Sequence, residues 1–244
     1  MIKISKQIIP AITIAALSVL TSCNTESTPL LAGTDVYQII STNDETGKLE
    51  YQLYAKALTY SAEVDTVTVQ YGTPLSSDGH TYPMSEITTN FYYEYLSDKQ
   101  DYEFGSGTYT FDATLDDGST LSATDKLTNS KLQPSVIDSC QYSEETIQGG
   151  AIKLKFVLDE HADGYNVSVS NADGNTLFYA GPVIVDGDTI ALNIPPYYFN
   201  ANYPQPQDGD ELQVRIDALD IQETTTGILD ALATTTTNLV WGEE

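Results

Sequence analysis

Apolar and polar residues alternate in short segments along most of this chain, and turn residues separate one segment from the next. Ile152, Leu154 and Phe156 share one face of an extended chain, and lysines occupy the two positions between them. The segments 49–57 and 109–115 repeat the pattern. Alternation with β-branched and aromatic residues is typical of a strand that buries one face and leaves the other in water. The sequence therefore predicts an all-β protein.

The spacing of these segments indicates two domains. Seven of them lie in the second half of the chain, with turn signals such as Asp173-Gly174 between neighbours. Many short strands at such spacing are typical of an antiparallel sandwich. The alternation lapses at 129–131, so we expect two tandem antiparallel β-sandwiches, one at 35–131 and one at 132–244.

One stretch near the C-terminus has weak helical character. Residues 227–232 could form one or two helical turns, but the threonine runs at 224–226 and 234–237 disfavour a longer helix. We therefore expect 227–232 to belong to a long connection between the last two strands.

The first residues predict a secretory signal peptide. Lys3 and Lys6 form a basic start, and an apolar run from Ile8 to Leu20 follows. A helix that spans a bilayer needs about 20 apolar residues, so this run is too short to be a membrane anchor. Residues 1–22 are expected to be removed on maturation.

The end of that run suggests how the mature protein is held. Leu20-Thr21-Ser22-Cys23 resembles the lipobox of bacterial lipoproteins. The resemblance implies cleavage before Cys23 and multiple acylation of this residue, which holds a protein stably on a membrane. Residues 23–34 show no alternation and are expected to be the lipidated Cys and a linker.

The charge of the chain excludes some partners. Lys and Arg number 10 against 35 Asp and Glu, a formal net charge of −25 at pH 7. Nucleic acid is not an expected partner, because binding polyphosphate requires clustered basic residues. The same argument disfavours docking on anionic headgroups, so the lipid must provide the membrane contact.

Residues 132–242 carry a second resemblance. The segment 164–167, the Asp173-Gly174 turn and the segment 212–218 look like those of a fibronectin type III-like domain. One departure is that no tyrosine stands near the start of the sixth strand, where such a residue often packs the corner. The corner must then be held in another way. The first domain is expected to be Ig-like from its alternation.

The sequence offers no positive sign of catalysis. The two histidines, His80 and His161, are expected on loops of different domains, and no phosphate-binding loop or Cys/His cluster is present. We expect no enzyme activity, no catalytic residue, no metal and no cofactor. The acidic loops 159–164 and 208–211 are interpreted as hairpin turns, with calcium binding as the alternative.

Cys140 is the thiol that remains after lipidation of Cys23, so no disulfide within the chain is expected. It is predicted on an edge strand. An unpaired cysteine usually behaves as a small buried apolar side chain. A reactive or intermolecular thiol is the alternative.

The loop 195–206 is the best candidate for a binding site. It carries four rings, from Tyr197, Tyr198, Phe199 and Tyr203, among prolines that stiffen it. Such rings could stack on the flat apolar faces of sugars, and the neighbouring Asn and Gln side chains could bond to sugar hydroxyls. In the alternative, the rings cap the open end of the core and replace the missing corner tyrosine.

Two three-residue segments, 65–67 and 188–190, resemble the acceptor pattern for O-glycosylation in Bacteroidetes. With the lipobox, this suggests an outer-membrane lipoprotein of that type, and leaves open whether it faces the periplasm or the cell surface. The expected function is a non-enzymatic binding or scaffolding module for carbohydrate or an outer-membrane protein.

The alternative is a fimbrial subunit or accessory, since some Bacteroidetes pilins are also lipoproteins made of two sandwiches. That family typically matures by cleavage after Arg or Lys in the first domain. Here the single arginine, Arg215, lies inside a predicted strand of the second domain, which disfavours Arg-specific processing.

Overall fold

The computed structural model describes residues 29–60, 63–71, 81–144, 150–183, 187–223 and 228–243. Fifteen strands and one short 3-10 helix account for the regular structure of these residues, which confirms the all-β prediction. In the same ranges, no helix has the length and apolar composition that a bilayer span requires. The predicted signal peptide and Cys23 lie outside the described residues.

Of the strands in the described residues, eight lie in the first half of the chain and seven in the second. The first half contains β1 (Leu30–Thr42), β2 (Leu49–Tyr60), β3 (Val64–Tyr71), β4 (Thr81–Pro83), β5 (Ser85–Thr88), β6 (Tyr92–Leu96), β7 (Gly107–Leu115) and β8 (Thr120–Leu127). The second contains β9 (Ile137–Ser143), β10 (Ala151–Val157), β11 (Gly164–Asn171), β12 (Thr176–Val183), β13 (Thr189–Ile194), β14 (Glu211–Glu223) and β15 (Ile228–Val240).

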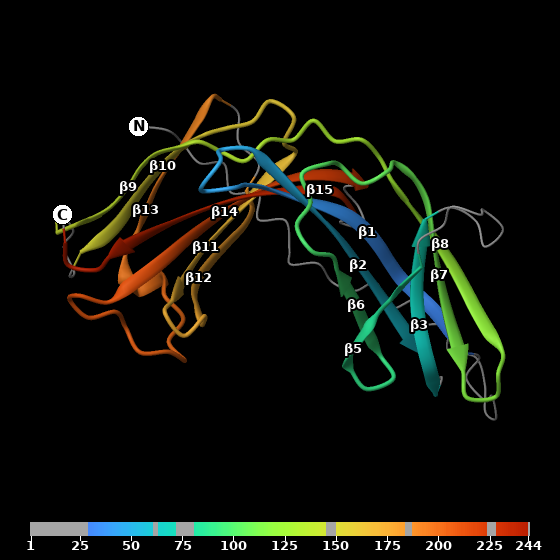
Figure 1. Ribbon diagram of the computed structural model, residues 1–244. Coiled ribbons are helices and arrows are strands. Elements are labelled where there is room, and N and C mark those ends of the chain that lie inside the picture. Colours follow the sequence, from blue (N-terminus) through green and yellow to red (C-terminus); the bar gives the residue numbers. More distant parts are fainter. Residues whose placement is uncertain are drawn as a thin grey trace.

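These strands form three sheets. The largest has the order β12-β11-β14-β15-β1-β2-β6-β5 and runs through both halves of the chain. The other two have the orders β13-β10-β9 and β4-β3-β7-β8. Figure 1 shows an arch, in which the large sheet forms the inner side and the smaller sheets lie on the outer side at opposite ends. Each small sheet therefore packs on its own part of one shared sheet.

Strands β1 and β15 join the two halves as parallel neighbours. Residues 38–40 pair in register with residues 231–233. The expectation that 227–232 belongs to a long connection, with at most one or two helical turns, is wrong from Ile228 onward, because β15 begins there and pairs with both β14 and β1. Helical propensity in this stretch is weak, and pairing on both sides overrides it.

Strand β1 also begins earlier than the sequence pattern indicates. It starts at Leu30, inside the segment 23–34 that was expected to be a linker. Val36 and Ile40 are buried on one face, while Tyr37 and Ile39 are half-buried on the other. A strand in the middle of a sheet that covers apolar residues on both faces shows no clean alternation, which explains why the pattern missed it.

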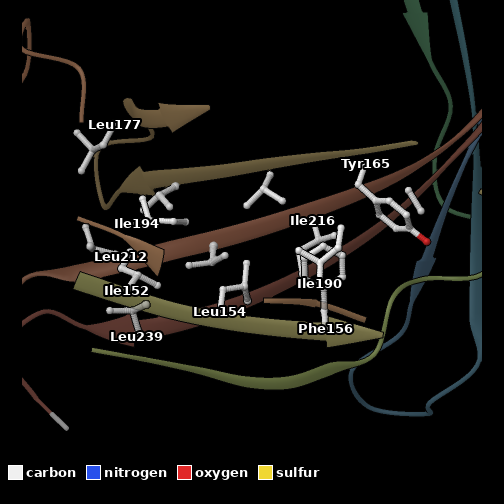
Figure 2. Packing of buried hydrophobic residues seen from close by; sticks show 14 of the residues in the cluster. Ile152, Leu154, Phe156, Tyr165, Leu177, Ile190, Ile194, Leu212, Ile216 and Leu239 are labelled. Atoms are coloured by element: carbon white, nitrogen blue, oxygen red, sulfur yellow. The ribbon is translucent and has the colours of Figure 1, made fainter. Parts of the chain in front are cut away.

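The second half has the core that its alternation predicts. Figure 2 shows Ile152, Leu154 and Phe156 of β10 packed with Leu212 and Ile216 of β14. All five side chains are buried, whereas Lys153 and Lys155 point out of the sandwich between them. Ile40 of β1 belongs to the same core, so a residue from the first half completes the second.

The first half has a separate core between its two sheets. Tyr109, Phe111 and Ala113 alternate inward on β7 and meet Leu53 and Ala55 of β2. The predicted alternation at 49–57 and 109–115 is therefore confirmed. The Asp117-Gly118 hairpin signal is confirmed too, since it connects β7 to β8.

A buried carboxylate lies beside the junction of the two halves. The Asp35 side chain on β1 is buried, and its Oδ2 lies 2.9 Å from Nζ of Lys56 on β2. Burial raises the pKa of Asp35 above its ordinary value, and Asp125 adds to this rise, while Lys56 opposes it. Asp125 in turn accepts the backbone N–H of Val36 at 2.7 Å. Ionisable side chains therefore lie beside the strand that connects the two cores.

Candidate functional site

The loop after β13 is shaped by its prolines. Pro195 is extended, and a 3-10 turn follows at Pro196–Tyr198. The amide of Tyr198 donates to the carbonyl oxygen of Pro195 at 3.0 Å, and the amide of Phe199 donates to that of Pro196 at 2.9 Å. Because proline at the start of a turn fixes φ and needs no N–H partner, the turn begins where the strand ends.

This turn sends neighbouring rings in opposite directions. Tyr197 and Tyr198 are 65% and 57% exposed, whereas Phe199 is 5% exposed. The two tyrosine rings lie against each other with centroids 4.5 Å apart. A hydrogen bond to Tyr198 raises the pKa of Tyr197, so the two hydroxyls are in contact. Tyr197 and Tyr198 therefore form a paired aromatic surface outside the core.

Phe199 belongs to the core and not to that surface. Its ring centroid lies 5.8 Å from that of Trp241, which in turn packs edge-on against Tyr142 at 4.8 Å. The expectation that Phe199 contacts a ligand does not fit this buried position. It performs the capping role that was the alternative for the whole loop.

Trp241 also explains how the corner is held without a tyrosine. Its amide donates to the carbonyl oxygen of Asp210 at 2.8 Å, and its own carbonyl oxygen accepts the amide of Gly209 at 2.8 Å. The indole packs against the rings of both Phe199 and Tyr142. A tryptophan after the last strand thus ties down the start of β14.

The loop is anchored on the edge strand β12. The amide of Asn200 donates to the carbonyl oxygen of Leu177 at 2.6 Å, and Tyr203 donates its amide to Asn200 at 3.1 Å. The Tyr203 ring is half-buried and packs against the core of the second half. These bonds hold the loop across the open edge of the shared sheet.

A groove of about 480 Å³ lies between this loop and β12, and we call it the aromatic groove. Its lining combines tyrosine rings, short polar side chains and the apolar residues Leu177 and Phe178. The tyrosine and polar side chains that define it are Asn175, Thr176, Tyr179, Tyr198, Asn200 and Tyr203. Tyr179 is 61% exposed, so the groove has an open ring on each side, one from β12 and one from the loop.

Three of the four predicted ligand-binding residues thus lie at or beside one groove, Tyr198 and Tyr203 in its wall and Tyr197 against Tyr198. The sequence reasoning missed Tyr179 and Asn175. Tyr179 follows Leu177 in a predicted strand, and nothing in that pattern shows that the loop would fold over this strand rather than a neighbour.

The acidic loops use their carboxylates on the backbone. Asp159 accepts the amides of Gln133 at 2.6 Å and of His161 at 2.7 Å, and Asp210 accepts that of Gln207 at 2.8 Å. These contacts match the turn interpretation. In the described part of the chain, no group of three or more His, Cys, Asp or Glu side chains is placed to hold a metal ion. His80 lies outside the described residues.

Cys140 lies on β9, an edge strand of the three-stranded sheet, as predicted. Its side chain is half-buried and packs against the core. Burial raises the pKa of its thiol to about 11. A thiol in that setting is largely protonated at neutral pH and is a poor nucleophile.

Compared with known proteins, the chain matches no family model, and no curated protein matches it.

Proposed function

We propose that this chain is a membrane-tethered, non-enzymatic lipoprotein that binds carbohydrate in the aromatic groove. The observation that carries the proposal is the position of Tyr179 and Tyr198, two exposed rings that line one groove from different elements. A soluble domain gains nothing for its own stability from rings held in water. Exposed aromatic side chains that line a hollow are typical of a binding site.

The chemistry of the groove suits sugars. The apolar face of a sugar ring can stack on a tyrosine, and the tyrosine hydroxyl remains available at the polar edge. Asn175 and Asn200 add amide donors and acceptors within the same groove. Among the described residues, no charged side chain lines the groove, and the chain as a whole is strongly acidic, so the favoured ligand is a neutral glycan.

The strand orders support an Ig-like first domain and a fibronectin type III-like second domain. In the first half, β1, β2, β6 and β5 share one sheet and β3, β7 and β8 the other, which is the immunoglobulin partition with β4 added. In the second half, the fourth strand β12 pairs with β11, whereas constant-type immunoglobulin domains place their fourth strand in the opposite sheet. That difference favours the fibronectin type III-like assignment.

The positions of the start of β1 and of the aromatic groove also suit a receptor that is tethered at its N-terminal end. Figure 1 shows the start of β1 and the loop after β13 at opposite ends of the arch. A lipid on Cys23 precedes β1, so the aromatic groove would lie at the end far from the tether. Cys23→Ala should then abolish incorporation of labelled fatty acid and release the protein from the membrane fraction. Unchanged membrane association of that variant would contradict the tether.

A glycan array tests the binding function. The probe is the fragment 24–244, which contains every described residue. The wild type should bind a neutral glycan, and the variant Tyr179→Ala/Tyr198→Ala should lose that binding while its circular dichroism spectrum stays native. Tyr102→Ala is the matched control, because Tyr102 is an equally exposed ring (58%) in the first half.

Two results would contradict the proposal. One is undiminished glycan binding by the folded double variant. The other is a wild-type protein that binds no glycan on the array, in which case pull-downs of outer-membrane proteins become the test of a protein partner.

A further inference from the structure

A second groove, of about 410 Å³, lies on the face of the shared sheet that points away from the three-stranded sheet. We call it the polar groove. Most of its side chains carry hydroxyls or amides, and one guanidinium and one carboxylate are present. The polar side chains that the argument uses are Ser168, Ser170, Glu211, Gln213, Arg215 and Asn238. In Figure 1 this face is the inner side of the arch.

Strand register brings these side chains together. Val167 and Val169 of β11 point into the core, so Ser168 and Ser170 point outward. Ser168 is the register partner of Arg215 and Ser170 that of Gln213, so their side chains share the same face of β14. On β15, Asn238 pairs with Gln213, which extends the polar row across three strands.

The two grooves share lining residues at the β11–β12 turn. Gly174 and Thr176 line both of them. A Cβ placed on Gly174 would meet no atom within 4 Å, so the space beside it is open. A chain-like ligand could therefore pass from the aromatic groove over this turn into the polar groove.

The charge of the polar groove favours a neutral ligand. Nε of Arg215 lies 2.7 Å from Oδ1 of Asp217, and Glu211 lines the same groove. The single cationic group there is thus offset by carboxylates. Beside these charged groups lies a row of neutral donors and acceptors, which suits the hydroxyls of a sugar chain.

We propose that the polar groove is the second half of an extended glycan site, so that the ligand is a neutral oligosaccharide long enough to occupy both grooves. This inference rests on the proposed function of the aromatic groove. The rings hold one end of the chain by stacking, and Gln213 and Asn238 bond to hydroxyls of the sugars that follow. Binding should accordingly strengthen with chain length.

Calorimetric titration of the fragment 24–244 tests this. The probes are size ladders of neutral glucan, galactan and mannan oligosaccharides, from disaccharide to octasaccharide, and a matching ladder of acidic galacturonan. For the neutral series that binds, affinity should rise with length and then level off. Gln213→Ala/Asn238→Ala should weaken binding of the longest oligomer about tenfold, as expected for losing two amide hydrogen bonds. It should leave disaccharide binding unchanged.

The matched control is Gln141→Ala/Asn193→Ala. These two exposed amides are both register partners of Lys153 on the outer face of the opposite sheet, so they mirror the tested pair. The control should bind every oligomer as the wild type does.

Different results would overturn different claims. If the longest oligomer binds no better than the disaccharide, or if Gln213→Ala/Asn238→Ala binds it normally, the extended site is wrong and the aromatic groove stands. If galacturonan binds more tightly than every neutral series, the neutral ligand is wrong. If no ladder binds at any length, the proposed function and this inference fall together.

Discussion

Ile40 of β1 and Ala233 of β15 are register partners in a parallel pair of strands, although they come from opposite ends of the chain. Both are buried in the core of the second half. The two halves therefore share a strand pair, a sheet and part of a core, and they are expected to unfold together.

Replacing Ile40 by Ala should test this coupling. Removal of a buried isoleucine side chain to alanine costs about 2–5 kcal/mol of the free energy of unfolding. Because Ile40 belongs to a first-half strand and a second-half core, one cooperative transition should shift to lower temperature. Scanning calorimetry measures it. Ile87→Ala is the control, since Ile87 is 51% exposed on β5 and should change little. Two separate transitions, of which one alone moves, would argue against coupling.

The adjacent residues Tyr198 and Phe199 should separate binding from stability. Phe199→Ala removes a ring buried against Trp241 and should lower the free energy of unfolding by about 3–5 kcal/mol. Tyr198→Ala removes an exposed ring and should change stability by less than about 0.5 kcal/mol. Urea titration compares the two variants. Equal destabilisation by both would mean that Tyr198 also supports the core.

Asp35 should make stability depend on pH. Burial raises the pKa of Asp35 above its ordinary value of 3.8. A carboxyl group whose pKa is higher in the folded chain than in the unfolded chain adds to the free energy of unfolding while it is protonated in both states. This stabilisation is lost as the pH rises from the pKa of the unfolded chain through that of the folded chain. The variant Asp35→Asn has no carboxyl group to ionise, so it should not lose this stabilisation. Its free energy of unfolding should therefore rise relative to that of the wild type as the pH rises through the acidic range.

Urea unfolding in a series of acidic to neutral buffers measures the difference. Asp65→Asn, at an exposed carboxyl, controls for the change in net charge. A constant offset between Asp35→Asn and the wild type at every pH would show that Asp35 has the same pKa in the folded and unfolded chains.

Cys140 should react slowly in the folded protein. Its thiol pKa is raised to about 11, so at pH 8 the thiolate fraction is about a hundredfold below that of an ordinary thiol. In the fragment 24–244 it is the one cysteine present, so alkylation by iodoacetamide reports on it alone. Unfolding in urea should restore ordinary reactivity. Equal rates in the folded and unfolded protein would contradict the burial.

Much of the second half could be predicted from sequence because its signals are local. The alternation in β10 and β11 reflects one buried and one wet face, and that relation needs only neighbouring residues. The Asp173-Gly174 turn was predictable for the same reason, since Gly174 adopts a positive φ of 79° that glycine tolerates. The early part of β15 was not predictable in this way, because residues 231–233 pair with β1 from the other end of the chain.

Some features of the candidate site are also visible in the local sequence, whereas others depend on contacts between distant residues. The residues of the loop after Ile194 already show that it is stiff, aromatic and rich in polar side chains, because these properties come from its prolines, rings and amides. Which rings pack in the core and which face water depends on the folded loop, because a single 3-10 turn directs Phe199 to Trp241 and Tyr198 to solvent. The tertiary structure also decided that Tyr179 joins Tyr198, since the amide of Asn200 ties the loop to β12. Contacts between residues far apart in sequence depend on how strands pair, and no local pattern encodes that pairing.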